Sequence, residues 1–281
     1  MVTLEKITKL PNFSSQLDNK ILYSEHDCDI EIQYQSTCTI KYVIEGSKHY
    51  HFKNQDSRVS SGQYIILNNS DIATKALKGS KGLSIFLSPQ LISEILHNLY
   101  GKNIDTLNFF EFPQSQHNLL GYQLKKMAHI FNNDPIFFLL QIEDLFMNLS
   151  ETLIRYHVNL ETKFSELKIA KYNTQKELFK YVSLTKEFIH DNYNHKISLD
   201  TLSKSSGISK YYLHRLFTEI IGHTPIEYLT YLRLNSAKRE LKNTKKSIFE
   251  IAIDNGFESS SYFSNIFKKS FKISPSQYRK Q

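Results

Sequence analysis

The spacing of hydrophobic residues changes character near residue 88. Up to that point, short runs rich in β-branched and aromatic residues are separated by turns that contain glycine or polar residues. The runs occupy residues 37–45, 48–52, 63–67, 73–77 and 83–87. Several short strands at this spacing predict a small β-barrel or β-sandwich over residues 1–88.

From residue 89 the apolar residues recur every three or four positions, which is the period of an amphipathic helix. We predict a helix that ends at Gly101, a second over about 119–131, and a third that opens at Asp134-Pro135 and carries an apolar stripe as far as Ile154. Such a stripe serves either the core of a domain or the interface of a dimer.

The last third of the chain contains two short helical patterns on either side of a glycine. Ser247 is a candidate N-cap, because its hydroxyl can accept a hydrogen bond from the first turn. Gly256 is a stop signal, because glycine adopts positive φ without steric cost. The second helix starts near Glu258 or Ser259. The apolar faces of the two helices consist of Ile248, Ile251, Ala252, Phe263, Ile266 and Phe267. This plan is typical of a helix-turn-helix unit.

The same pattern occurs earlier in the chain, offset by 49 residues for the first helix and by 50 for the second. The matching positions are Leu199, Leu202, Ser203, Gly207, Leu213, Leu216 and Phe217. Each copy is followed by a proline and a tyrosine, Pro225 with Tyr228 and Pro275 with Tyr278. A repeat at fixed spacing predicts two helix-turn-helix units in tandem. Residues 225–241 are then a linker helix with proline in its first turn.

Residues from about 182 to the C-terminus resemble the DNA-binding domain of the AraC/XylS family of bacterial transcription regulators. The residues that carry the resemblance are Ile251-Ala252, Gly256-Phe257, Ser261-Tyr262-Phe263, Phe267-Lys268-Lys269, Ser274-Pro275 and Tyr278-Arg279. One departure is that Phe271-Lys272 stands where the family usually has a glycine before the final Ser/Thr-Pro.

The resemblance implies an α+β protein. Its N-terminal part would be a small cupin-like β-barrel with a helical dimerisation segment, and its C-terminal part an all-α domain of two helix-turn-helix units joined by a linker helix. We therefore expect a regulatory domain at 1–158, with the barrel at 1–88 and the helices at 89–158. A polar linker follows at 159–175 and the DNA-binding domain at 176–281. A homodimer interface would lie in the helices of 116–157.

The outward residues of the second helix in each unit are the candidates for reading DNA bases. By the family pattern these are Tyr211, His214 and Arg215 in the first unit and Ser260, Ser261 and Asn265 in the second. Arginine pairs bidentately with guanine, and asparagine with adenine. The candidates for phosphate contact, which fix position without reading sequence, are Ser209, Lys210, Thr218, Lys238, Arg239, Lys245, Lys246, Ser259, Lys268 and Lys269. For any one of the lysines, a merely solvated role is the alternative.

The charge distribution agrees with a nucleic-acid partner. Residues 174–281 contain 18 Lys and Arg against 10 Asp and Glu, a formal charge of +8, whereas residues 1–173 contain 17 against 18, a charge of −1. The whole positive excess therefore lies in the tandem helix-turn-helix part, as expected if only this part meets phosphate. The partner we predict is double-stranded DNA, read as a bipartite site in successive major grooves about 34 Å apart.

Several other chemistries are not supported by the sequence. Cys28 and Cys38, with nine residues between them, match neither a zinc site nor a disulfide framework. His49 and His51 could share one face of a strand and bind a metal. However, no glutamate follows them closely and Asn68 and Asn69 stand where a late histidine is expected, so surface or pocket-lining histidines are favoured. We expect no metal and no cofactor.

We predict a sequence-specific DNA-binding transcription regulator, an activator, and not an enzyme. The resemblance implies that the bound protein recruits or repositions RNA polymerase. Its N-terminal domain would gate DNA binding through a small molecule, a partner protein or dimerisation. No apolar leader and no apolar run of about eighteen residues is present, so we expect a cytoplasmic protein on the bacterial nucleoid and no membrane partner. The alternatives are a non-specific architectural DNA binder, or an enzyme with a cupin-like catalytic barrel fused to the DNA-binding domain, including the alkylation-repair type.

Overall fold

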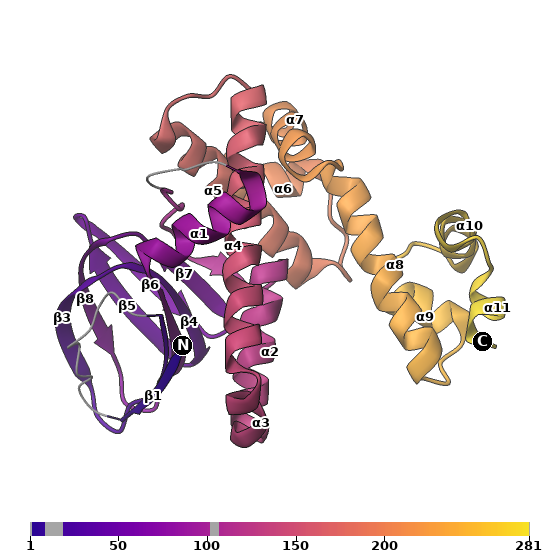
Figure 1. Ribbon diagram of the computed structural model, residues 1–281. Coiled ribbons are helices and arrows are strands. Elements are labelled where there is room, and N and C mark those ends of the chain that lie inside the picture. The colour runs from indigo at the N-terminus through magenta and orange to yellow at the C-terminus, as the bar shows by residue number, and fades with distance from the viewer. Residues whose placement is uncertain (1, 9–18, 102–106, 281) are drawn as a thin grey trace. The chain divides into compact units, whose positions relative to one another are not determined.

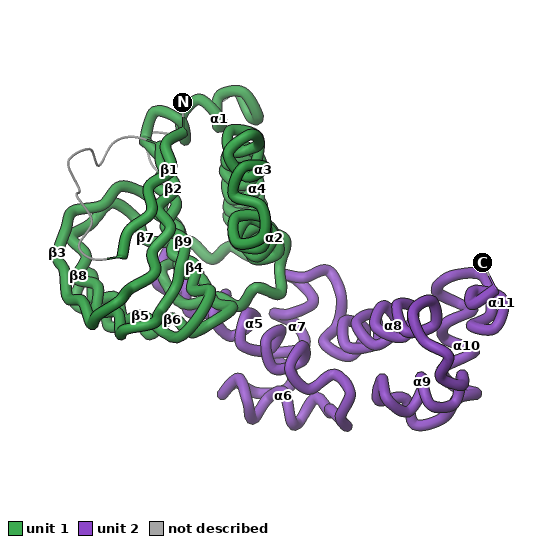
Figure 2. The backbone as a smooth tube through the Cα atoms, turned by 90° about the horizontal axis from the view of Figure 1, so that it is seen from below, with its two compact units in different colours: residues 1–170 green, residues 171–281 purple. Residues whose placement is uncertain are grey.

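The computed structural model describes residues 2–8, 19–101 and 107–280. The chain forms two compact units, residues 1–170 and residues 171–281 (Figure 2). The first unit combines β-sheets with helices, and the second is entirely helical in the part that is described. The predicted α+β organisation, with a helical C-terminal part, is therefore confirmed.

Two sheets make up the β-rich part of the first unit (Figure 1). The six-stranded sheet has the order β1 (Thr3–Ile7), β2 (Lys20–Glu25), β9 (Lys81–Leu87), β4 (Cys38–Glu45), β7 (Gln63–Leu67) and β10 (Gln114–Ser115). The four-stranded sheet has the order β3 (Ile30–Ser36), β8 (Ser70–Ala76), β5 (Ser47–Phe52) and β6 (Gln55–Ser60). Strands β1 and β2 are parallel, and the other described pairs are antiparallel.

Of the two predicted alternatives, the two separate sheets agree with the β-sandwich. The small cupin-like β-barrel that the resemblance implied does not close, because no strand of one sheet pairs with a strand of the other within the described residues. The chain changes sheet at short turns instead. At Gly46, whose φ is 75°, it leaves β4 in the six-stranded sheet and enters β5 in the four-stranded one. Positive φ at such a tight turn is accessible to glycine without strain. A sequence predicts where strands and turns occur, but it does not show which strands pair at the edges of a sheet.

The six-stranded sheet is buried on both of its faces. In β4, Ile40 and Tyr42 belong to the core shared with the helices, whereas Val43 belongs to the core between the two sheets. Alternate residues of a strand point to opposite faces, so this alternation places Lys41 on the same side as Val43. Burial on both faces explains why the first six residues of β4 are all buried.

The described part of the first unit also contains four helices: α1 (Pro89–Tyr100), α2 (Leu119–Asn133), α3 (Pro135–Leu140) and α4 (Ile142–Glu166). Helix α1 ends at Gly101 in the left-handed region, as predicted. The predicted third helix is two helices, interrupted at Gln141 with φ −109° and ψ 6°. Helix α4 continues into the segment that we interpreted as a linker, because Leu160 and Phe164 extend its buried stripe.

The second unit contains seven described helices: α5 (Tyr172–Asn192), α6 (Leu199–Ser206), α7 (Lys210–Ile221), α8 (Pro225–Asn243), α9 (Ile248–Asp254), α10 (Ser260–Phe271) and α11 (Pro275–Arg279). Helix α8 is the predicted linker helix, with a capping box between Thr224 and Glu227 and Pro225 in its first turn. Nowhere in the described part of either unit does a helix combine the length and the apolar character needed to cross a bilayer.

Candidate DNA-binding interface

Helix α7 is amphipathic and presents its polar face to solvent. Helix α6 before it ends at Gly207, with φ 77°. Ser209 then caps α7, and its hydroxyl accepts from the amide of Tyr212 at 3.4 Å. Leu213, Leu216 and Phe217 are buried. The turn and the buried stripe together orient the remaining face of α7 to solvent.

That outward face carries the predicted base readers of the first helix-turn-helix unit. Tyr211 is 79% exposed, and His214 and Arg215 are also exposed. The Nε of Arg215 donates to Glu219 Oε1 at 3.0 Å, one helical turn away. Such an exposed pair contributes little to stability, so Arg215 can exchange this partner for a guanine edge.

Two of the predicted phosphate contacts on α7 have partners within the protein. Lys210 Nζ donates to Asp200 Oδ1 at 3.2 Å, and this hydrogen bond raises the pKa of Lys210. The hydroxyl of Thr218 donates to the carbonyl of His214 at 2.7 Å. Lys210 is therefore held at the start of α7, where the amides of the first turn also attract anions.

The second helix-turn-helix unit, α9 and α10, repeats this construction. Ser247 and Glu250 form a capping box at the start of α9, and hydrogen bonds from Ser247 lower the pKa of Glu250. Ser259 caps α10 and accepts from the amide of Tyr262 at 3.2 Å. Ser261 and Asn265 are exposed, while Ser260 is half-buried. Two of the three predicted base readers of this unit are thus openly accessible.

An aromatic cluster holds α10 from behind. Phe263 packs against Phe257 and Phe267 with ring centroids 5.0 and 5.5 Å apart. Phe267 lies 5.7 Å from Tyr278, the tyrosine that follows the repeated proline. Such aromatic pairs add stability beyond the area they bury. The rigid support fixes the orientation of the polar face of α10.

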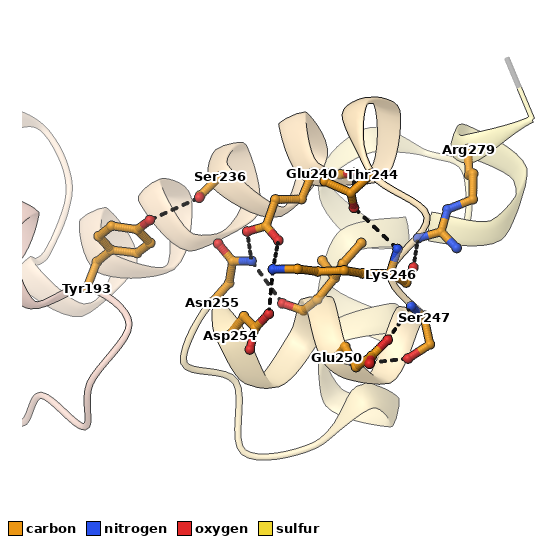
Figure 3. A network of polar contacts seen from close by, with 11 residues as sticks. Tyr193, Ser236, Glu240, Thr244, Lys246, Ser247, Glu250, Asp254, Asn255 and Arg279 are labelled. Carbon is orange, nitrogen blue, oxygen red and sulfur yellow. Dashed lines mark hydrogen bonds and ion pairs between the residues drawn. The ribbon is translucent and has the colours of Figure 1, made fainter.

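A polar network joins α8, α9 and the C-terminal helix (Figure 3). Lys246 Nζ lies 2.8 Å from Asp254 Oδ2 and 3.2 Å from Glu240 Oε2. The buried Asn255 donates from Nδ2 to Glu240 Oε1 at 2.8 Å. Arg279 donates from Nη2 to the carbonyl of Lys246 at 2.6 Å. The sequence reasoning missed Glu240, Asn255 and Arg279 as positioning residues.

The predicted phosphate contacts differ in what they touch. Lys238 Nζ lies over the rings of Phe271 and Tyr278, at 4.8 and 5.4 Å from their centroids, and Lys246 bridges two carboxylates. Both have partners within the protein, although the side chain of Lys246 is itself exposed. The remaining basic candidates, Arg239, Lys245, Lys268 and Lys269, are all exposed.

The two histidines weighed as a metal pair face solvent. His49 and His51 are exposed on β5, and His51 Nδ1 lies 2.9 Å from Asp56 Oδ1. Across the described residues, no three His, Cys, Asp or Glu side chains are grouped so that they could hold a metal ion. Cys28 is exposed and Cys38 is buried, both as free thiols.

Comparison with known proteins places this helical construction in a family. A family model described as a helix-turn-helix domain matches residues 202–281. The regulatory protein SoxS of Salmonella typhimurium is 39% identical over 93 residues, which cover 33% of this chain and 87% of SoxS. The bifunctional transcriptional activator/DNA repair enzyme AdaA of Bacillus subtilis is 36% identical over 99 residues, which cover 35% of this chain and 47% of AdaA.

Among solved structures, the C-terminal domain of the two-component response regulator yesN from Fusobacterium nucleatum is 35% identical. The match covers 34% of this chain and 94% of that chain, with a TM-score of 0.34.

The second unit is thus a tandem helix-turn-helix DNA-binding domain, and the class of protein is a sequence-specific transcription regulator. The chain belongs to the AraC/XylS family, which confirms the resemblance found in the sequence.

Proposed function

We propose that the protein is a transcription activator that reads a bipartite DNA site through α7 and α10. The observation that carries this proposal is that two capped helices with buried apolar stripes each present an exposed polar face. On α7 the base-reading residues would be Tyr211, His214 and Arg215. On α10 they would be Ser260, Ser261 and Asn265, with the half-buried Ser260 contributing least. The name of AdaA, a transcriptional activator, supports the sign of regulation.

The phosphate contacts would come from groups around these two helices. The hydroxyls of Ser209 and Ser259 and the side chains of Lys210 and Thr218 lie at or near the starts and faces of the recognition helices. The exposed basic residues would contribute most: Arg239, Lys245, Lys268 and Lys269. Lys238 and Lys246 would contribute only by exchanging their internal partners for phosphate.

The first unit would act as a cupin-like regulatory domain. We propose a division into a regulatory domain at 1–158, a connection at 159–175 and the DNA-binding domain at 176–281. The first part of the connection, as far as Glu166, is the end of helix α4. A signal received by the first unit would change DNA binding, and the DNA-bound protein would recruit RNA polymerase. This activity belongs in the bacterial cytoplasm, on the nucleoid, and requires no enzymatic step.

Exposed apolar residues on α2 and α3 support a homodimer through the helices of 116–157. Ile136 and Leu140 are 74% and 79% exposed, and Leu119 and Tyr122 are 65% and 64% exposed. Ile136 and Leu140 are four residues apart on α3 and therefore share one face of that helix, and exposed apolar side chains that lie together mark interaction sites. A second copy of the same chain would cover the same patch on both partners, as a two-fold interface requires.

Selection of random-sequence DNA by the full-length protein tests the proposal, with enriched sequences read at two salt concentrations. We expect a two-part motif. Arg215→Ala should relax the preference in one half and cost about 1–3 kcal/mol there. Arg239→Ala, an exposed arginine outside the recognition helices, serves as the control and should weaken all sequences alike while reducing the salt dependence. Binding without any enriched motif would contradict specific recognition and favour the architectural alternative.

A further inference from the structure

The first unit contains a pocket between its two sheets, away from the DNA-binding unit. Its lining comes from the facing sides of β1, β2, β4 and β9 in one sheet and of β3, β5 and β8 in the other. The pocket is half open: the space between and in front of these side chains amounts to about 350 Å³, a figure that includes the open solvent at its mouth. Ile7, Leu22, Ile30, Ile32 and Phe86 supply apolar walls.

Two buried lysines line this pocket, one from each sheet. Lys41 and Lys48 are only 3% and 5% exposed. Lys48 Nζ donates to Ser24 Oγ at 2.5 Å and lies 3.3 Å from His26 Nε2. A Cβ at Gly82 would come within 3.2 Å of this Nζ, so the glycine leaves room for the ammonium group.

Among the described residues, Lys41 Nζ makes no comparable hydrogen bond and is surrounded by aromatic rings. Its Nζ lies over the rings of Phe86 and Tyr34, at 4.4 and 5.1 Å from their centroids. No aspartate or glutamate is found among the lining residues that the structure describes. Burying a cation without a counter-charge is costly. Burial lowers the pKa of Lys41 well below its usual range and that of Lys48 to about 7.

The imidazole of His26 brings a further nitrogen to the pocket. His26 is 3% exposed, and its Nδ1 has no hydrogen-bond partner among the described residues. Buried polar atoms of this kind are rare in native proteins and call for a ligand, water or functional explanation. Among the described lining residues the pocket thus offers cationic and neutral donors beside apolar walls, and no carboxylate is one of them.

We propose that this pocket binds a small organic carboxylate. The carboxylate group would lie between Lys41 and Lys48, and the apolar body would pack against Phe86 and the aliphatic walls. Charge-assisted hydrogen bonds to a carboxylate are among the strongest available, and the apolar walls favour an organic anion over inorganic phosphate. The assignment names the chemical class of the effector and rests on the proposed regulatory function of the first unit.

Binding of an anion here must be coupled to protonation. A bound carboxylate supplies the missing counter-charge and raises the pKa of both lysines, so the protein takes up protons as the ligand binds near neutral pH. The other titratable groups that face the lysines are His26, Tyr34 and Tyr50. Burial and the nearby Lys48 lower the pKa of His26 to about 4, and burial raises the pKa of Tyr34 to about 12 and that of Tyr50 well above its usual range. These three groups stay neutral in the relevant range.

Calorimetry on the full-length protein without DNA tests the proposal. Benzoate and hexanoate are titrated beside benzamide and hexanamide, which have the same bodies without the charge, and beside inorganic phosphate. We expect a carboxylate to bind at least about tenfold more tightly than its amide. The heat measured at neutral pH should vary with the ionisation enthalpy of the buffer, which reports proton uptake. Equal affinity of acid and amide, binding of phosphate alone, or no binding of either carboxylate would overturn the proposal.

Variants locate the site. Lys41→Met should lower the affinity for the carboxylate at least about tenfold. Lys75→Met, at an exposed lysine of β8 whose Nζ pairs with Glu31 at 2.9 Å, should leave it unchanged. Unchanged affinity in Lys41→Met would overturn the assignment. If that variant does not fold, the wild-type proton uptake decides, and its absence contradicts the proposal. A carboxylate that binds at Lys41 without changing DNA affinity would establish the pocket and remove its role as the gate.

Discussion

Lys272 occupies a backbone conformation that glycine, Gly222, occupies at the matching position of the first helix-turn-helix unit. It ends α10 in the left-handed region with φ 66°, and Gly222 ends α7 with φ 87°. Residues with a Cβ are strained there. Lys272→Gly should therefore raise the free energy of unfolding by about 0.5–1 kcal/mol, the relief of strain being partly offset by the greater freedom of glycine in the unfolded chain. Urea denaturation of the full-length protein measures this, and no gain would contradict the interpretation.

Gly222 provides the matched control. A Cβ at this position would meet no atom within 4 Å, so Gly222→Ala changes the backbone preference without a clash. We expect it to destabilise the protein by about 1 kcal/mol. A neutral result would show that the left-handed turn costs little in this fold.

Lys48 makes the stability of the first unit depend on pH. Its pKa is about 7 in the folded protein, against about 10.4 in an unfolded chain. Below pH 7 both states carry the charge, and its burial opposes folding. As pH rises above 7, the folded state loses the proton while the unfolded state keeps it, so stability rises up to about pH 10. Lys48→Met should flatten this rise in the unfolding free energy, measured with urea at intervals of pH. An unchanged slope would contradict the lowered pKa.

At the scale of elements, local signals in the sequence sufficed for the helix-turn-helix units. The cap at Ser247 and the stop near Gly256 are set by neighbouring residues, and the structure shows them where they were expected. The predicted third helix failed at Gln141, where no glycine or proline marks the break. Its continuation to Glu166 was missed because Leu160 and Phe164 are too sparse among polar residues to stand out.

Asn255 joins α8 and α9 of the second unit and is fully buried. Its Nδ2 donates to Glu240 Oε1 and to the carbonyl of Ile251. Asn255→Ala should cost about 1–3 kcal/mol, because Glu240 and the carbonyl lose a buried donor. Asn243→Ala, at the exposed end of α8, should change stability by less than about 0.5 kcal/mol. Thermal unfolding of both variants makes the comparison, and equal effects would show that the network in Figure 3 does not support the fold.

At the scale of the whole molecule, long-range pairing limits what a sequence reveals. Lys41 and Lys48 are only seven residues apart, yet they belong to different sheets that face each other across the pocket. Strand patterns indicated the β structure around both lysines but not which strand each would pair with. Without that pairing the two charges could not be brought together, and the pocket could not be predicted.

The exposed apolar residues of α2 and α3 make a prediction about assembly. Leu140→Lys should shift the protein from dimer to monomer, because a charge at a dry interface is costly to bury. Leu77→Lys, at another leucine that is 60% exposed, is the control and should not change the mass. Sedimentation velocity over a range of protein concentrations measures both. A wild-type protein that stays monomeric at all concentrations would contradict the proposed interface.

The central claim is that α7 and α10 each read one half of a bipartite site. The most direct measurement compares Arg215→Ala with Asn265→Ala in the same selection of random-sequence DNA by the full-length protein. The account predicts that Arg215→Ala loses preference in one half-site only and Asn265→Ala in the other only, each by about 1–3 kcal/mol for the affected base. If both variants relax the same half, or if both only weaken binding uniformly, the two helices do not divide the site between them and the account is contradicted.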